Sequence, residues 1–194
     1  MTEDMTTPTN VVVAYNFTQS ALPALERAVK LAARAPFHIL HVVCAIEPTN
    51  PIPAVGPGPV DYRYAERAQQ TLAEEMASML RSADISDRVH FFVHARIGRP
   101  AEEILECARE VGAELILVGT KGLTGVERVV LGSVAERIVR EAKCTVEVVR
   151  ATTYPYVKLM NITEVEPHPH YVPPHRYSYE DRRLTVRPSE WPLY

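Results

Sequence analysis

A doubly wound α/β fold, in which a five-stranded parallel sheet carries helices on both faces, is the architecture that this 194-residue sequence predicts. Short apolar runs rich in β-branched residues alternate with longer segments whose apolar residues recur at helical spacing. The connections between them are mostly short. Strict alternation favours parallel strands, because each parallel crossover needs a covering helix. Right-handed crossovers then place helices on both faces, in a Rossmann-like arrangement.

The elements follow the order β-α-β-α-β-α-β-α-β within a domain predicted to span residues 10–150. The first strand is a β-branched apolar run, which indicates burial on both faces. A helix with apolar residues three and four apart follows it and ends before Pro36, where a helix cannot continue. The later segments repeat this pattern. The predicted strands are residues 11–15, 38–44, 89–94, 114–118 and 145–149, and the predicted helices are residues 21–35, 62–83, 100–111 and 133–142.

Two segments lie outside this pattern. Residues 1–9 are polar and are predicted to form a disordered lead. Residues 151–194 hold seven of the 16 prolines, six of the nine tyrosines and the only tryptophan. So many prolines exclude long helices and central strands, whereas so many aromatic residues are unusual in a free linker. We interpret this segment as an extended Pro/Tyr-rich C-terminal arm that packs against its own domain or a partner subunit.

Composition excludes several classes of function. The net charge of −3 gives no electrostatic reason to expect a nucleic-acid partner, and no apolar run approaches the roughly 20 residues that cross a bilayer. The acidic, polar start lacks the features of a signal peptide, so we expect a cytoplasmic protein. The three cysteines form no C-x-x-C pair and are interpreted as small buried residues, with a reactive thiol as the alternative.

No metal site is predicted. The histidines of the domain, among them His41 and His94, are interpreted as packed or surface side chains. His168, His170 and His175 in the arm are close enough in sequence to bind zinc or copper. No cysteine completes a site, and Glu164 and Glu166 are the only nearby carboxylate pair, so a packed or solvated arm is the preferred interpretation.

A ligand site is expected beyond the carboxyl ends of the strands, where the strand order reverses. The loops after the first and fourth strands are the natural candidates. The loop after the second strand, residues 46–61, is rich in proline and glycine and longer than most connections. Such a length is typical of a lid or binding loop.

The loop after the fourth strand reads G-x2-G-x9-G-S, filled by Gly119, Gly122, Gly132 and Ser133. Glycine lets backbone N–H groups approach a phosphate closely, and the helix that follows adds unpaired donors and a positive dipole end. Lys121 and Arg128 could add positive charge, and the Ser133 hydroxyl could donate a hydrogen bond to a phosphate oxygen. On spacing alone the alternatives stay open, since glycine also ends strands and serine is a common helix N-cap.

This spacing resembles the nucleotide-binding motif of the ATP-binding branch of the universal stress proteins. The segments 96–105, 112–119 and 144–150 also resemble that family, and the likeness covers roughly residues 10–150. It implies binding of ATP or AMP. The loop and helix residues that would hold phosphates and ribose are Gly119, Thr120, Lys121, Gly122, Arg128, Gly132, Ser133 and Val134. The residues that would lie beside the nucleoside are Tyr15, Asn16, Phe17 and Thr18, with the backbone of Val42 at the adenine edge.

The end of the first strand departs from the family, which usually has aspartate and glycine where this chain has Asn16 and Phe17. Asn16 keeps a carbonyl acceptor but loses the charge. Because hard cations favour carboxylate oxygen, this change disfavours Mg²⁺ and metal-assisted hydrolysis more than it disfavours binding.

The resemblance therefore implies a nucleotide-binding regulatory protein of the stress response, with at most weak ATP hydrolysis. Two alternatives remain: a nucleotide-independent interaction module that uses the C-terminal arm, and a slow ATPase. The resemblance also implies a homodimer through residues 145–149, with the arm contributing. An apolar edge strand is an aggregation risk unless it is covered, which agrees with a dimer, although the arm could cover the same edge.

Overall fold

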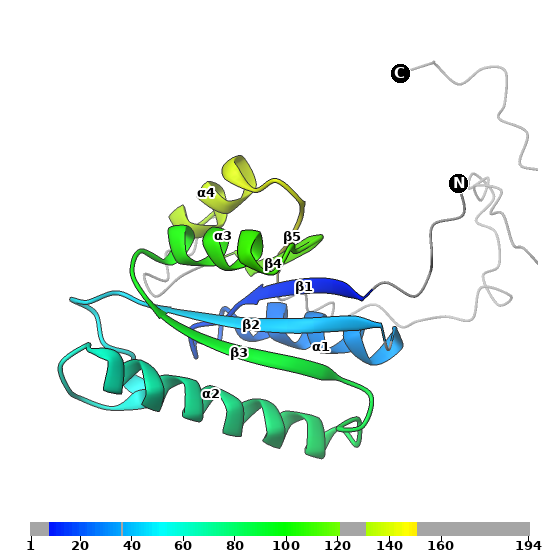
Figure 1. The fold of residues 1–194 in the computed structure, drawn as a ribbon, viewed down its shortest axis with the longest axis horizontal. Coiled ribbons are helices and arrows are strands. Elements are labelled where there is room, and N and C mark those ends of the chain that lie inside the picture. The colour runs from blue at the N-terminus through cyan, green and yellow to red at the C-terminus, as the bar shows by residue number, and fades with distance from the viewer. Residues whose placement is uncertain (1–7, 36, 121–130, 151–194) are drawn as a thin grey trace, which may run out of the picture. The chain divides into compact units, whose positions relative to one another are not determined.

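The structure is a computed structural model that describes residues 8–35, 37–120 and 131–150. Five parallel strands form one sheet in the order β3-β2-β1-β4-β5 (Figure 1). This confirms the predicted fold class. The strands are β1 (Thr9–Ala14), β2 (His38–Ile46), β3 (His90–Ile97), β4 (Leu115–Gly119) and β5 (Thr145–Val149). The helices are α1 (Leu22–Arg34), the short 3-10 helix η1 (Pro53–Val55), α2 (Tyr62–Ser82), α3 (Pro100–Glu110) and α4 (Ser133–Glu141).

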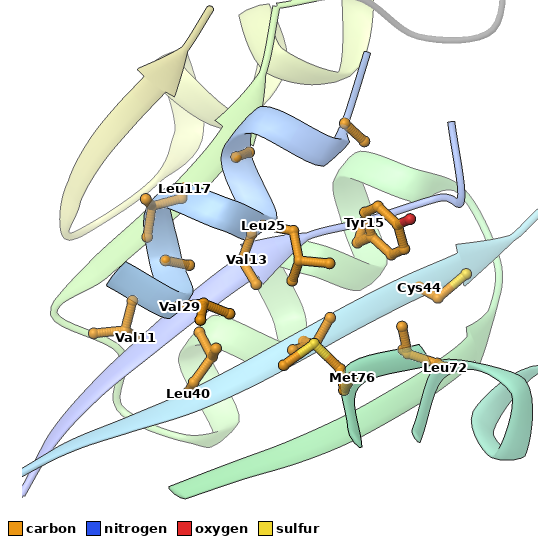
Figure 2. Close-up of a cluster of buried hydrophobic side chains, with 14 of the residues drawn as sticks. Val11, Val13, Tyr15, Leu25, Val29, Leu40, Cys44, Leu72, Met76 and Leu117 are labelled. Atoms are coloured by element: carbon orange, nitrogen blue, oxygen red, sulfur yellow. The ribbon is translucent and has the colours of Figure 1, made fainter. Parts of the chain in front are cut away.

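The helices divide between the two faces of the sheet, as a doubly wound fold requires. Helices α1 and α2 cover one face, and α3 and α4 cover the other (Figure 1). Successive residues of β1 point to opposite faces, so Val11 and Val13 pack toward α1 and α2, whereas Val12 packs toward α3 and α4. Figure 2 shows the buried side chains between the sheet and helices α1 and α2, with Leu25 and Val29 of α1 beside the strand residues.

Helix α2 shows how the sequence specifies one of these layers. Its N-cap is Asp61, whose carboxylate accepts the Tyr64 N–H at 2.9 Å. A buried residue then recurs at every fourth position, which gives the helix a single apolar stripe. The residues of this stripe are Tyr64, Ala68, Leu72, Met76 and Leu80.

Strands β2 and β3 both run further than the sequence predicts. Their ladder pairs eight residues, from Ile39 opposite His90 to Ile46 opposite Ile97. The predicted third strand ended at His94, before Arg96. In the structure Arg96 stays within the strand, since its guanidinium pairs with carboxylates of α3 at 2.9 Å and 2.7 Å.

The sheet order places the reversal at β1. From this strand the chain moves to β2 on one side, whereas β4 lies on the other side. The carboxyl ends of β1 and β4 are therefore neighbours, and the loops that leave them diverge to opposite faces. Strand β1 begins at Thr9, one residue before the predicted start of the domain. The C-terminal arm lies outside the described residues. Within the described part of the chain, every helix is too short or too polar to cross a membrane.

Candidate functional site

A cavity of about 290 Å³ opens at the carboxyl edge of the sheet, where the order reverses. The ends of β1, β2 and β4 form its floor, and the first residues of α3 and α4 form a wall. The predicted site residues that line it are Tyr15, Asn16, Gly119, Gly132, Ser133 and Val134. Of the other predicted site residues, Phe17, Thr18, Val42 and Thr120 are described but lie outside the lining, whereas Lys121, Gly122 and Arg128 lie outside the described residues.

The N-terminus of α4 forms one side of the cavity. Gly132 is the N-cap, with φ −62° and ψ 149°, and no described side chain caps the helix. The first turn, Ser133 to Ala135, lines the cavity. The Gly132 N–H donates to the Thr120 carbonyl at 2.9 Å, which ties the end of β4 to the start of the helix. Because the first amides of a helix lack intrahelical partners, this end can accept a phosphate group.

Gly119 is required by packing as well as by any ligand. A Cβ atom at this position would lie 2.6 Å from the Ser20 carbonyl oxygen and 3.4 Å from the Ala21 Cα. Both are backbone atoms, so neither can rotate away. Gly119 therefore lets the end of β4 approach the turn that starts α1. This contrasts with Gly132, whose backbone dihedrals any residue can adopt.

The loop after β1 is closed by its own side chains. The Asn16 carbonyl oxygen accepts the Thr18 hydroxyl at 2.6 Å and the Thr18 N–H at 3.3 Å. Because a backbone N–H can only donate, the amide oxygen faces Thr18 and the Nδ2 donor is the remaining polar atom of Asn16. Phe17 lies between them at φ 60°, in the left-handed region that side chains rarely adopt.

Tyr15 connects the cavity to α2. Its hydroxyl donates to the Glu75 carboxylate at 2.5 Å, and its ring packs against Phe17 at a centroid distance of 5.4 Å. Burial, followed by the Glu75 carboxylate, raises the pKa of Tyr15 well above its usual range. The side chain is therefore a neutral hydrogen-bond donor, fixed by a partner on α2.

The sequence interpretation named no site residue in the loop after β2, which forms one side of the cavity. Glu47, directly after β2, lines it together with the segment Asn50 to Pro53. The Asn50 N–H donates to the Glu47 carbonyl at 3.0 Å, which closes a tight turn. The loop 46–61 was predicted to be a lid or binding loop, and its length and proline content were the signals that pointed to it.

A buried tyrosine holds this loop in place. Tyr64 is fully buried, and its hydroxyl accepts the Ile52 N–H at 2.8 Å. The same hydroxyl lies within donating distance of the Ile52 and Gly56 carbonyls, at 3.0 Å and 3.1 Å. One side chain of α2 thus accepts a backbone N–H of this loop and donates its single proton to a neighbouring loop carbonyl.

Val42 has a buried side chain that points away from the cavity. It packs toward α1 and α2, while its neighbour Val43 points to the opposite face and lines the cavity. Because successive side chains of a strand point to opposite faces of the sheet, the side chain of Val43, rather than that of Val42, lines the cavity.

On the adjacent strands β2 and β3, His41 and His94 form a pair that the sequence interpretation did not join. Their Nδ1 and Nε2 atoms lie 3.0 Å apart, and His41 Nε2 lies 3.1 Å from the Asn10 Oδ1. The Asn10 Nδ2 donates to the Val111 carbonyl at 2.7 Å, so Oδ1 must accept from His41. His94 then donates to His41, which donates to Asn10. This directed chain links β3, β2, β1 and the end of α3.

Burial disfavours the charged form of both histidine rings of this hydrogen-bonded pair. Burial and the neighbouring His94 lower the pKa of His41 to about 4. The pKa of His94 is lowered by burial and by Arg96, against an opposing effect of Glu110. At neutral pH both histidines are therefore uncharged.

The three thiols are not activated. Cys44 and Cys107 are buried, as predicted, and Cys144 is partly buried. Burial raises the pKa of Cys44 to about 12, and it also raises the pKa of the other two. Within the described residues no three histidine, cysteine or carboxylate side chains gather into a metal site.

Comparison with known families decides the assignment of this fold. Residues 8–150 match the model of the universal stress protein family. The chain belongs to this family. A universal stress protein of Methanocaldococcus jannaschii is 31% identical over 144 residues, which cover 72% of this chain and 81% of the relative.

Solved structures agree with the assignment. A universal stress protein family structure from Burkholderia pseudomallei superposes with a TM-score of 0.54 at 29% identity, over 77% of this chain and 99% of the other. A family protein from Arabidopsis thaliana, solved with AMP bound, has a TM-score of 0.50 at 17% identity, over 75% and 93% of the two chains. The second likeness is one of fold.

The departure of this universal stress protein at the end of β1 has a structural consequence. Phe17 has a backbone conformation that glycine adopts without strain, and it is retained by packing against Tyr15 and the core. Asn16 uses its acceptor to close the loop. The polar atom left to the cavity is a donor, which suits an anionic or carbonyl group rather than a metal ion.

Proposed function

We propose that this universal stress protein binds an adenine nucleotide, ATP or AMP, in the cavity at the carboxyl edge of the sheet and acts as a regulatory protein in the cytoplasm. The observation that carries the proposal is the first turn of α4, which lines the cavity without a side-chain cap. The phosphates would lie at this turn, beside Gly119 and Gly132. The apolar floor, which includes Ala14, Val43 and Val118, suits a nucleoside.

The cavity favours binding over catalysis. Of the described residues that line it, one carries a charge, Glu47. Asn16 offers a donor where metal-assisted hydrolysis would need a carboxylate. The AMP bound to the Arabidopsis protein, which shares the fold, agrees with the choice of ligand. We therefore propose that occupancy by nucleotide, rather than turnover, is what the protein uses.

Replacing Gly132 by aspartate tests this proposal. Aspartate is a preferred N-cap residue and the dihedrals of Gly132 are open to it, so the variant is expected to fold as well as the native chain. Its carboxylate would repel a phosphate at the same turn. Isothermal titration calorimetry with AMP and ATP should show binding to the native chain and a loss of at least tenfold in the variant, about 1.4 kcal/mol or more.

The matched control places the same charge elsewhere. Gln69 lies exposed on α2, a helix that contributes no residue to the described cavity lining, and its replacement by aspartate should leave nucleotide affinity unchanged. Native affinity in the Gly132 variant would contradict the proposed position of the phosphates, and no binding to the native chain would contradict the function itself.

We also propose a homodimer through β5, to which the C-terminal arm contributes. In the described part of the chain β5 pairs with β4 along one edge, and its residues Val146 to Val149 are only partly buried. A strand edge of this kind is a ready site for pairing with a second copy. Light scattering of the purified full chain should give the mass of a dimer, and a monomer at micromolar concentration would contradict the proposal.

A further inference from the structure

Glu47 occupies the place at which dinucleotide-binding folds recognise ribose. It directly follows β2, the strand beside β1, and it lines the same cavity as the first turn of α4. In Rossmann domains an acidic residue that follows the second strand accepts hydrogen bonds from ribose hydroxyls. The family likeness points instead to the end of β1, where this chain has Asn16.

The structure removes Asn16 from that role. Its amide oxygen, the one acceptor of the side chain, is already bonded to the Thr18 hydroxyl at 2.6 Å and to the Thr18 N–H. A ribose hydroxyl would have to compete with both. The Glu47 carboxylate has no such commitment, since none of the residues in the described ranges hydrogen-bonds to it or pairs with it.

The two ends of the cavity have opposite polarity. The turn at Ser133 offers N–H donors and the positive end of a helix dipole, whereas Glu47 offers acceptors and a negative charge. Strand β1 separates β4 from β2, so these two strands lie roughly 10 Å apart, two strand spacings. This polarity favours a nucleotide that lies across β1 with its phosphate at α4 and its hydroxyl groups toward β2.

The backbone around Glu47 is held in place. Its carbonyl accepts the Asn50 N–H at 3.0 Å, and the segment that follows is anchored by the buried Tyr64 hydroxyl. A carboxylate on such a fixed turn can accept two hydrogen bonds side by side, which matches the two adjacent hydroxyls of a ribose.

We propose that Glu47 is the residue that selects the sugar, accepting hydrogen bonds from the 2′- and 3′-hydroxyls of a ribonucleotide. This inference rests on the proposed function and adds a specificity to it. Deoxyribonucleotides would leave the carboxylate without its donors, and a sugar that carries a 2′- or 3′-phosphate would be repelled by it.

Calorimetry with AMP, 2′-deoxy-AMP and 3′-deoxy-AMP tests the inference. The native chain should bind AMP about tenfold or more tightly than either deoxynucleotide, as expected for a hydrogen bond to a charged group. Glu47→Ala should weaken AMP by a similar factor and bind all three with nearly equal affinity. Glu114→Gln, at the amino end of β4, is the matched control and should keep the native preference.

Each outcome separates the two proposals. Equal affinity of the native chain for AMP and the deoxynucleotides overturns the role of Glu47 and leaves the function standing, as does a preference that persists in Glu47→Ala. No binding of any nucleotide to the native chain overturns both. Because the Glu47 carboxylate has no described partner, Glu47→Ala should keep the native unfolding midpoint. If this variant does not fold, Glu47→Gln, which loses the charge and one acceptor, takes its place in the same comparison: a reduced preference for AMP supports the role of Glu47, and an unchanged preference overturns it.

Discussion

Replacing Gly119 by alanine is expected to lower the free energy of unfolding by about 3 kcal/mol, the upper end of the cost of overpacking a core. The added Cβ would lie 2.6 Å from the Ser20 carbonyl oxygen, so the backbone itself must move. The turn that it would displace is held by hydrogen bonds from Ala21 and Leu22 to the Thr18 carbonyl, at 3.0 Å and 3.2 Å. Urea denaturation of the native chain and the variant measures the effect.

Gly132→Ser is the control for this prediction. It changes another glycine of the same motif, but at dihedrals that any residue adopts and in the N-cap position that serine favours. Its unfolding free energy should stay within about 0.5 kcal/mol of the native value, as for most substitutions without a strained contact. A Gly119→Ala variant as stable as Gly132→Ser would show that the close approach of β4 to the α1 turn does not constrain residue 119.

Acidification is expected to destabilise the fold through His41. Its pKa is about 4 in the folded chain against 6.5 in the unfolded chain, so between these values the unfolded chain binds more protons. The contribution of His41 to stability is therefore fully present above about pH 6.5, and it is lost as the pH falls toward 4. The whole difference corresponds to about 3 kcal/mol, of which about 2 kcal/mol should be lost by pH 5.

Urea denaturation between pH 5 and pH 7.5 measures this loss, above the range in which the paired carboxylates Glu102 and Glu110 titrate. His41→Leu should be less stable at neutral pH, since Asn10 and His94 lose a partner, but most of the pH dependence should disappear. His90→Leu changes an exposed histidine of β3 and should keep the native slope. A native slope in His41→Leu would assign the acid sensitivity to other groups.

The sequence was sufficient to predict the sheet because its signals are local. The run Val11 to Val13 and the helical spacing in α2 each depend on neighbours along the chain. The ends of β2 and β3 could not be predicted in the same way. They are fixed by the ladder between the two strands and by the pairing of Arg96 with α3, which joins residues far apart in sequence.

The candidate site likewise contains residues that local sequence predicts and residues that only the tertiary structure brings together. The loop after β4 was predicted because glycine spacing is visible in the sequence, and Gly119, Gly132 and Ser133 do line one cavity. Glu47 was not named because nothing local distinguishes it within the loop 46–61, which was predicted to be a lid or binding loop. Its place in the cavity follows from the strand order, which puts β2 next to β1, and from the hydroxyl of Tyr64, which holds the adjoining loop. The pairing of His41 with His94 is likewise a product of strand register.

The most direct test of the central claim is an amide chemical-shift titration of the ¹⁵N-labelled native chain with AMP. We expect the largest shifts at the first turn of α4, at Ser133 and Val134, and at Gly119 beside it. Amides on the exposed face of α2 should not move. Shifts confined to β5 or to residues 151–194, or no shifts at millimolar AMP, would contradict a nucleotide site at the carboxyl edge of the sheet.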